Sequence, residues 1–462
     1  MCGSGDSMAI PHRTYGALQV KLRESLITRA LLLPIQEFIH IQGISSIFLL
    51  GAAIAALIWA NSPWRDSYHH VWELELTLST IQLPVHAWIN DALMAIFFFL
   101  VGMEIKHEIV HGELSDARKA ALPIVGALGG MIVPALLFIA INYGRPGQNG
   151  WGVPMATDIA FSLGVLGMVK GIPSELKVFL LTLAIADDIG AIVVIAFVYT
   201  RSFHVEALFI GIFFLLVMFG LRRLGITRAI VYVVLGTAFW VAVLRSGVHA
   251  TIAGVILGFM VPTTPRLSLQ EFQEIGTDMI HRFRTAWSEG DTATANRLLG
   301  SFEQLVNATE ADSERITRNL NDWVSFLVLP LFALSNAGVT FSGGGINGIL
   351  SSRIAWGVLL GLVIGKPIGI VAFCKLAVKL GVARLPNGVT WLQMAAVGTL
   401  AGIGFTVSIF ISSLAFGNPV HLMEAKTAVL VASLVAGLAG FFALRFRYGG
   451  NRRGAVGVTA EG

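Results

Sequence analysis

The sequence predicts an all-α integral membrane protein with twelve transmembrane helices, and three observations support this fold class. Of its 462 residues, 55% are hydrophobic and 13% are charged, against about 25% charged in an ordinary soluble domain. The mean hydropathy of +0.75 leaves too little polar surface to coat a water-soluble particle. The apolar runs last about 20 residues without alternation, as spanning helices require, whereas spanning strands would alternate over about 10 residues.

Turn residues separate the apolar runs and so mark the expected spans. In chain order these spans are 44–60, 88–105, 120–143, 152–169, 175–199, 205–221, 226–244, 247–262, 323–341, 353–377, 390–416 and 425–446. The loops on one side of the membrane hold about four times as many Lys and Arg residues as the loops on the other side, and such an excess is typical of cytoplasmic loops. We therefore expect one membrane domain, 44–446, between a cytoplasmic N-terminal segment, 1–43, and a cytoplasmic tail, 447–462.

Two segments between spans have patterns of their own. Polar and apolar residues alternate over 73–84, which predicts a short external β-hairpin, and a lone hairpin needs a partner to be stable. Apolar residues recur at helical spacing in 263–322, which predicts a cytoplasmic helical hairpin. The pattern of 16–40 is that of an amphipathic helix on the membrane surface, and a disordered tail is expected from Gly449.

The charge and cysteine content exclude several classes of protein. The formal net charge of +4 matches the basic cytoplasmic loops of a membrane protein, so no nucleic acid partner is expected. Cys2 and Cys374 are too few and too far apart for a disulfide framework. The N-terminal region holds no apolar core that ends in a small-residue cleavage site, so we expect no cleavable signal. No cofactor is expected.

Two adjacent carboxylates, Asp187 and Asp188, interrupt the apolar run of the fifth span. A central Asp opposes membrane insertion by roughly 2.5–3.5 kcal/mol, while each Leu, Ile, Val or Phe returns about 0.3–0.6 kcal/mol. The pair therefore cancels about a dozen favourable residues. Such residues usually face an internal cavity or an ion path. The alternative is a structural polar pair that holds helices together.

Asp158 and Lys366 are two further charges inside apolar runs, in the fourth and tenth spans. Pro154 removes a helical donor, which predicts a break at 154–158, where the hydroxyl of Thr157 is also available. A central lysine needs a partner, so Lys366 is expected to pair with one of the three acids. The alternatives are a proline kink with a hydrogen-bonded Asp158, and a lysine that reaches the membrane interface.

Glycines and weaker polar signals complete the set of candidate residues. Gly402 and Gly404 predict a helix break in the eleventh span, although glycines at such spacing also pack helices together. Glu104 and Glu108 lie one turn apart near the inner end of the second span, either as a pH-responsive cation funnel or as a solvated helix end. We interpret His249 as a core histidine, with a proton sensor as the alternative.

Seven strings of the sequence closely resemble the bacterial NhaA Na+/H+ antiporter family. They are NDALMAIFFFLVGMEIKHE (90–108), ATDIAFSLGVL (156–166), LAIADDIGAI (183–192), LRSGVHATIAG (244–254), LPLFALSNAGV (329–339), GKPIGI (365–370) and GIGFTVSIFISSLAFG (402–417). The combination of ATDIAF, a following DD and a later GKP is highly specific. The likeness covers 44–446, apart from 265–315.

The resemblance implies a function and roles for particular residues. By resemblance, Asp188 is the principal metal ligand, with Asp158 and Thr157 beside it at the broken fourth span. Asp187 is then a neighbour that pairs with Lys366. The resemblance also implies a broken eleventh span, an inverted repeat of the third to fifth spans in the tenth to twelfth, and a homodimer joined through the external hairpin. The implied activity is electrogenic exchange of Na+ or Li+ for H+ at the bacterial inner membrane, with a role in pH and salt homeostasis.

The sequence departs from the family pattern at the inner end of the ninth span. Family members carry acidic and histidine residues there that are linked to pH regulation, whereas this chain has Thr317, Arg318, Asn319, Leu320 and Asn321. The preceding loop is also longer than is typical. We therefore do not carry the family's pH-sensing role over to this stretch.

The expected mechanism is competition for buried carboxylates. Sodium is a hard cation that prefers oxygen ligands, and either a proton or a sodium ion can neutralise a buried acid. One alternative is a sodium-coupled organic-anion symporter with a similar crossed-helix core, which would need Arg, Asn or Gln in its pocket. Another is an intramembrane aspartyl protease that uses Asp158 and Asp188. The sequence has neither a mid-span Arg nor the GxGD motif of such proteases. The choice among Na+, Li+ and K+ stays open.

Overall fold

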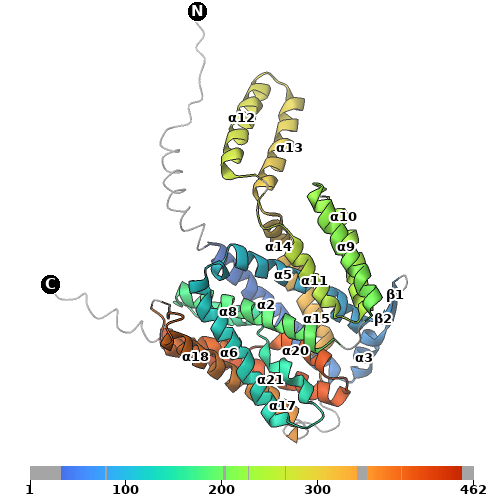
Figure 1. The fold of residues 1–462 in the computed structure, drawn as a ribbon, viewed down its shortest axis with the longest axis vertical. Coiled ribbons are helices and arrows are strands. Elements are labelled where there is room, and N and C mark those ends of the chain that lie inside the picture. Colours follow the sequence, from blue (N-terminus) through green and yellow to red (C-terminus); the bar gives the residue numbers. More distant parts are fainter. Residues whose placement is uncertain are drawn as a thin grey trace, which may run out of the picture.

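The described residues form a helical bundle with one short two-stranded sheet (Figure 1). The computed structural model describes residues 33–78, 81–200, 204–226, 228–265, 267–340, 351–386 and 388–449. Most of the expected N-terminal segment and of the C-terminal tail lies outside these ranges.

The helices of the first half are α2 (Leu33–Ala60), α3 (Arg65–Glu73), α4 (Val85–Trp88), α5 (Met94–Val110), α6 (Ala117–Asn142), α7 (Ile159–Gly167), α8 (Ser174–Val198), α9 (Val205–Arg223), α10 (Ala229–Ser246) and α11 (Ala250–Met260). Those of the second half are α12 (Leu269–Ser288), α13 (Thr292–Thr309), α14 (Asp312–Trp323), α15 (Leu329–Asn336), α17 (Arg353–Leu360), α18 (Lys366–Lys379), α19 (Trp391–Ala401), α20 (Phe405–Ala415) and α21 (Pro419–Gly449). Two short 3₁₀ segments are η2 (Glu113–Ser115) and η3 (Gln148–Met155). The π-helical turns η1 (Ile89–Leu93), η4 (Val324–Val328) and η5 (Gly361–Gly365) join α4 to α5, α14 to α15 and α17 to α18.

Seven helices in the described part of the chain are long and apolar enough to cross a membrane, or up to nine if each of two bent pairs is one span. The helical membrane fold is therefore confirmed. All twelve expected ranges fall on helical segments, but three of them are not among these nine spans. Residues 152–169 are split between η3 and α7, 247–262 hold the 11 residues of α11, and 323–341 are shared by η4 and α15. A divided span presents no full-length apolar helix, which lowers the count below twelve.

The N-terminal region differs from the sequence-based expectation in two ways. α2 begins at Leu33, so the described end of the expected surface helix 16–40 continues into the first span. The sequence also gave no sign of α3, which turns by 115° from α2. The hydroxyl of Tyr68 holds α3 against α15 by donating to the Leu334 carbonyl at 2.9 Å.

Two helices are interrupted where the sequence predicts a break. η3 and α7 are separated by the extended residues 156–158, just after Pro154. α19 and α20 meet at an angle of 49° around Gly402 and Gly404. A β carbon on Gly402 would lie 2.4 Å from the carbonyl oxygen of Leu362, so the second break needs glycine for close packing.

The helices α6 and α18 pack against each other in backbone contact. A β carbon on Gly129 would lie 2.3 Å from the carbonyl oxygen of Gly369, and one on Gly369 would lie 2.1 Å from that of Gly129. One turn earlier on α6, Gly126 faces Cys374 further along α18, so the two helices run antiparallel. This close approach places Lys366, at the start of α18, in the interior of the bundle.

The expected β-hairpin is confirmed by β1 (Glu75–Leu78) and β2 (Ile81–Pro84). They pair in antiparallel register, with Glu75 opposite Pro84 and Leu78 opposite Ile81. The turn residues 79–80 lie outside the described ranges.

The expected helical hairpin within 263–322 is confirmed by α12 and α13, which stand away from the rest of the bundle in Figure 1. The rings of Phe272 and Phe302 hold the two helices together, with centroids 6.3 Å apart. A capping box begins α12: the Ser268 hydroxyl accepts from the Glu271 N–H, and the Glu271 carboxylate accepts from the Ser268 N–H at 2.8 Å. Bonds from the Ser268 amide and hydroxyl lower the pKa of Glu271.

A third helix, α14, also lies within the expected loop 263–322. It continues through η4 into α15, so the helix of the ninth span begins at Asp312 instead of 323. The stretch 312–329 contains neither glycine nor proline, and nothing in the sequence interrupts the helix there.

Candidate cation-binding site

The two broken helices meet at their interruptions. The backbone N–H of Asp158 donates to the carbonyl of Ile403 at 2.7 Å. Its side chain lies at the start of both α7 and α20. Oδ1 accepts from the Phe161 N–H at 3.1 Å, and Oδ2 accepts from the N–H and the hydroxyl of Thr406 at 3.0 and 2.6 Å. One carboxylate thus caps the N-terminal, partly positive ends of two helices.

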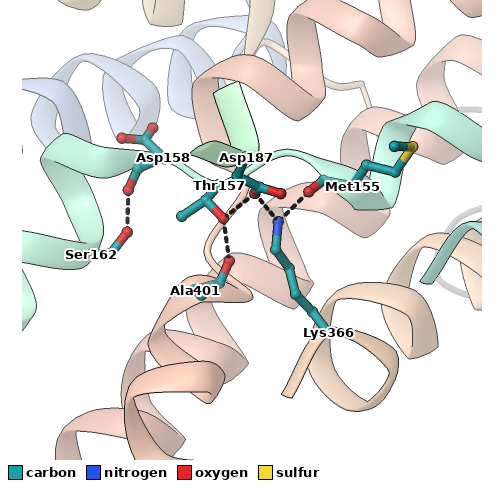
Figure 2. Close-up of polar contacts among 7 residues, drawn as sticks. All are labelled: Met155, Thr157, Asp158, Ser162, Asp187, Lys366 and Ala401. Carbon is teal, nitrogen blue, oxygen red and sulfur yellow. Dashed lines mark hydrogen bonds and ion pairs between the residues drawn. The ribbon is translucent and has the colours of Figure 1, made fainter. Parts of the chain in front are cut away.

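Lys366 lies at the carbonyl end of η3, the first half of one broken helix (Figure 2). Its fully buried ammonium donates to Oδ2 of Asp187 at 2.6 Å and to the carbonyl of Met155, the last residue of η3. The hydroxyl of Thr157 lies 2.6 Å from the same Asp187 oxygen and 3.0 Å from the carbonyl of Ala401, where α19 ends. A hydroxyl has one proton, so it donates to only one of these oxygens at a time. The lysine therefore pairs with an acid, as expected, and that acid is Asp187.

A cavity of about 40 Å³ lies beside the breaks and is lined by Asp188. Its polar lining consists of Glu104, Thr157, Asp158, Asp188, Asn321, Ser325 and Thr406. Asp188 is 3% exposed, and its Oδ1 is buried with no hydrogen-bond partner among the described residues. Asp187 is absent from the lining. Neighbouring residues on a helix point about 100° apart, so α8 turns one carboxylate to the cavity and the other to Lys366.

The remaining predicted residues lie in different places. Glu104 lines the cavity, whereas Glu108 does not, and its Oε1 accepts from the Glu113 N–H at 3.1 Å. His249 stands at the start of α11, where its Nε2 lies 3.2 Å from the carbonyl oxygen of Tyr199. The structure therefore brings only one of these three side chains to the cavity.

Three lining residues were not predicted as site residues. Thr406 follows the glycine break by two positions, and its place in the first turn of a new helix is a signal that sequence analysis could have used. Asn321 and Ser325 lie one turn apart on α14 and η4. They carry no comparable signal, because single polar residues are common at solvated helix ends.

A second, half-buried chain of polar side chains lies outside this cavity. The ammonium of Lys426, on α21, donates to Oδ1 of Asn336 at 3.2 Å. The Asn336 amide donates in turn to Oδ1 of Asn90 at 2.8 Å. These contacts join α21, α15 and η1. Sequence analysis did not predict these contacts, since a lysine near the end of a span often extends to solvent.

The possible ligand atoms around the cavity are all oxygens, from carboxylates, hydroxyls and an amide, and a hard cation prefers oxygen ligands. Within the described ranges, no group of three or more His, Cys, Asp or Glu side chains is arranged to hold a metal ion. In a membrane protein, interrupted helices are tolerated where they line a cavity, and buried ionisable residues mark ion paths. This fold and site define a secondary transporter of cations.

The chain belongs to the Na+/H+ antiporter 1 family, which it matches over residues 36–444. It is 43% identical to the Na+/H+ antiporter NhaA 2 of Syntrophotalea carbinolica, over 89% of this chain and 96% of that protein. It is 43% identical to NhaA of Rhodopirellula baltica, over 88% and 92%, and 42% identical to NhaA of Koribacter versatilis, over 96% and 96%. The family resemblance is confirmed. The comparisons give no support to an organic-anion symporter or a protease.

Proposed function

We propose that this protein is a Na+/H+ antiporter that exchanges Na+ or Li+ for protons across the bacterial inner membrane and serves pH and salt homeostasis. Membership of the Na+/H+ antiporter 1 family supports the activity. The observation that carries the proposal at atomic level is the carboxylate of Asp188. It is buried, has an oxygen without a partner among the described residues, and faces a cavity shared with Asp158 and Thr157.

Competition for one buried site accounts for the exchange. A buried carboxylate is costly unless it is protonated or paired with a cation. Asp188 is therefore neutralised either by a proton or by Na+, with the oxygens of Asp158 and Thr157 beside it. Because the two ions exclude each other, a carrier that opens this site alternately to each side of the membrane moves them in opposite directions.

The pair of Asp187 and Lys366 supports an electrogenic exchange. Lys366 is held by the Asp187 carboxylate and the Met155 carbonyl. If Asp187 turns toward a bound cation, the lysine loses its counter-charge and releases a proton. More than one proton then moves for each cation, and the titrations of Asp187, Asp188 and Lys366 are coupled.

The helix order supports twelve crossings with an inverted repeat. The first unit is α6, the broken pair η3–α7, and α8; the second is α17–α18, the broken pair α19–α20, and α21. The antiparallel contact between Gly129 and Gly369 is the one expected when the first helices of two inverted units meet. The excess of Lys and Arg on one side supports cytoplasmic termini.

We also propose roles for the acidic and histidine residues near the cavity and for the β-hairpin, from their positions in the fold. The position of Glu104 in the cavity lining supports a cation funnel. Glu108 and His249 do not line the cavity, and for them we propose a pH response at a distance from it. The sheet of β1 and β2 supports a homodimer. A two-stranded hairpin is marginal alone, and within the described ranges each strand has one edge without a neighbouring strand, with which a second copy can pair.

Sodium-driven proton movement in proteoliposomes tests this function. A Na+ gradient across vesicles that hold the wild-type protein should change the fluorescence of an internal pH dye. Asp188→Asn keeps the side-chain size but removes the charge, and it should abolish the signal while the purified protein stays folded. Asp278→Asn is the matched control, because Asp278 pairs with Arg282 on the exposed surface of α12.

The outcomes of this experiment are separable. Exchange that persists in Asp188→Asn would refute the site. A wild-type protein that moves no protons with Na+, Li+ or K+ would refute the function.

A further inference from the structure

The hydroxyl of Thr406 is a polar group in the cavity that the proposed exchange has not used. Thr406 lies in the first turn of α20, is 2% exposed, and lines the same cavity as Asp188. Its Oγ1 lies 2.6 Å from Oδ2 of Asp158. Both oxygens of Asp158 accept backbone N–H groups, so the carboxylate is the acceptor in this contact and the hydroxyl is the donor.

This hydroxyl is not needed to begin the helix. The backbone N–H of Thr406 caps α20 on Asp158 at 3.0 Å, and that of Phe161 caps α7 at 3.1 Å. Both caps are main-chain bonds and survive the loss of the hydroxyl. A structural role for the Thr406 side chain is therefore redundant, although the side chain is buried beside charged groups.

A hydroxyl that donates its proton keeps two lone pairs on its oxygen. Donation to a carboxylate polarises the O–H bond and makes that oxygen more negative. A hard cation prefers such an oxygen as a neutral ligand. In the same cavity, Asp188 offers the full negative charge through an oxygen without a partner among the described residues. The two groups complement each other as ligands.

We propose that Thr406 is a further ligand of the transported cation: its Oγ1 coordinates the ion while its proton stays hydrogen-bonded to Asp158. This inference rests on the proposed antiport and deepens it. Asp158 then acts on the ion chiefly through Thr406, as a positioning residue that orients the hydroxyl. Asp188 remains the charged ligand.

Removal of the Thr406 hydroxyl tests this role, because the loss of a ligand should change the KM for Na+ and leave kcat nearly unchanged. Thr406→Val keeps the side-chain volume and both main-chain caps. In proteoliposomes it should raise the KM for Na+ about tenfold, as expected for the loss of one contact to an ion, while kcat stays within about twofold. Thr406→Ser, which restores a hydroxyl, should return the KM close to the wild-type value. Thr427→Val is the matched control, since the buried hydroxyl of Thr427, in the part of the chain that the structure describes, bonds only the Met423 carbonyl, at 2.8 Å, on α21.

A second measurement uses purified protein in detergent. Added NaCl should raise the Tm of wild-type protein and of Thr406→Ser, and should raise that of Thr406→Val less at the same concentration. If Thr406→Val does not fold, Thr406→Cys takes its place, because a thiol is a poor ligand for Na+. Thr406→Cys should show the same rise in the KM for Na+ as is expected for Thr406→Val, whereas Thr406→Ser should show no such rise.

Three outcomes overturn the inference. A wild-type KM in Thr406→Val, or in Thr406→Cys where that replaces it, shows that the ion does not use the hydroxyl. An equal rise in KM in Thr427→Val shows a general packing effect. A raised KM that Thr406→Ser does not restore shows that the methyl group matters instead. The wild-type protein is measured in the same vesicles. If it shows no exchange, the proposed function fails, which is a different result from a functional antiporter that does not need Thr406.

Discussion

At the scale of single residues, Lys366 and Asp187 form an enclosed ion pair. Both side chains are fully buried, and the Lys366 ammonium also donates a hydrogen bond to the carbonyl of Met155 at the end of η3. Taking two charges out of water costs several kcal/mol for each ion, and their attraction offsets this cost only while both partners are present. The pair is therefore more sensitive to the loss of one partner than to the loss of both.

Lys366→Ala should lower the stability of the protein by about 3–5 kcal/mol, because it leaves the Asp187 carboxylate buried without a counter-charge. The double variant Asp187→Leu with Lys366→Met removes both charges and should be the more stable of the two, although neither variant can exchange ions normally. Thermal unfolding of the purified proteins in one detergent measures the difference. A double variant that melts at or below the Tm of Lys366→Ala would contradict this account.

The sequence was sufficient to find the four buried charges, since each of them opposes membrane insertion. The sequence alone could not show which aspartate forms the ion pair with Lys366. Asp187 and Asp188 differ by about 100° around one helix axis, and the rotation of α8 depends on its neighbours. Resemblance to the family supplied that assignment. Thr406 was not predicted as a site residue because a threonine costs little in an apolar run, and its position two residues after the glycine break was not used.

At the scale of elements, glycines allow helices to approach until their backbones touch. Gly129 and Gly369 do this for α6 and α18, and Gly254 does it for α11, where a β carbon would lie 2.1 Å from the carbonyl oxygen of Ala95 on α5. Small residues at helix contacts are a common means of packing in membranes. The contact between α6 and α18 also fixes the depth of Lys366 in the bundle.

Gly129→Ala should therefore destabilise the protein, by about 1–3 kcal/mol for an overpacked contact. Its β carbon would meet the Gly369 carbonyl at 2.3 Å, and a backbone oxygen cannot move aside as a flexible side chain can. Gly51→Ala in α2 is the matched control: a β carbon there would have no described atom within 4 Å, and alanine favours a helix. The Tm in detergent should fall for the first variant only. Equal Tm values for the two variants would show that α6 and α18 are not held at this contact.

Helix breaks were predictable where the chain carries a residue that causes them. Pro154 and the pair Gly402 and Gly404 mark the two interruptions directly. The π-helical turns η1, η4 and η5 were not foreseen. Each inserts an extra residue into a continuous helix. Pro330 follows η4 and Pro367 follows η5 within two residues, and neither proline has an N–H to donate to the preceding turn. The sequence likewise could not show that α14 continues into the ninth span, since its polar residues are typical of a loop.

At the scale of the whole molecule, composition predicted the membrane class, and the apolar runs predicted where the helices lie. The arrangement of those helices around the cavity depends on contacts between segments far apart in the chain, such as Asp158 with Thr406, and single-sequence patterns do not report such contacts. One part stands apart from this arrangement. The hairpin of α12 and α13 contributes no residue to the lining of the cavity.

Excision of this hairpin should leave the antiporter functional. The chain leaves and returns at one place, because the N–H of Leu267 donates to the carbonyl of Ala308 at 3.1 Å, so a linker of a few glycine and serine residues can replace 268–307. Beyond the excision, the N–H of Ser313 still holds the start of α14 by donating to the Pro262 carbonyl at 3.0 Å. The shortened protein should keep the wild-type KM for Na+ and a similar kcat, measured against full-length protein in parallel vesicles. A folded, shortened protein without exchange would instead show that transport depends on the hairpin, although it lies away from the cation site.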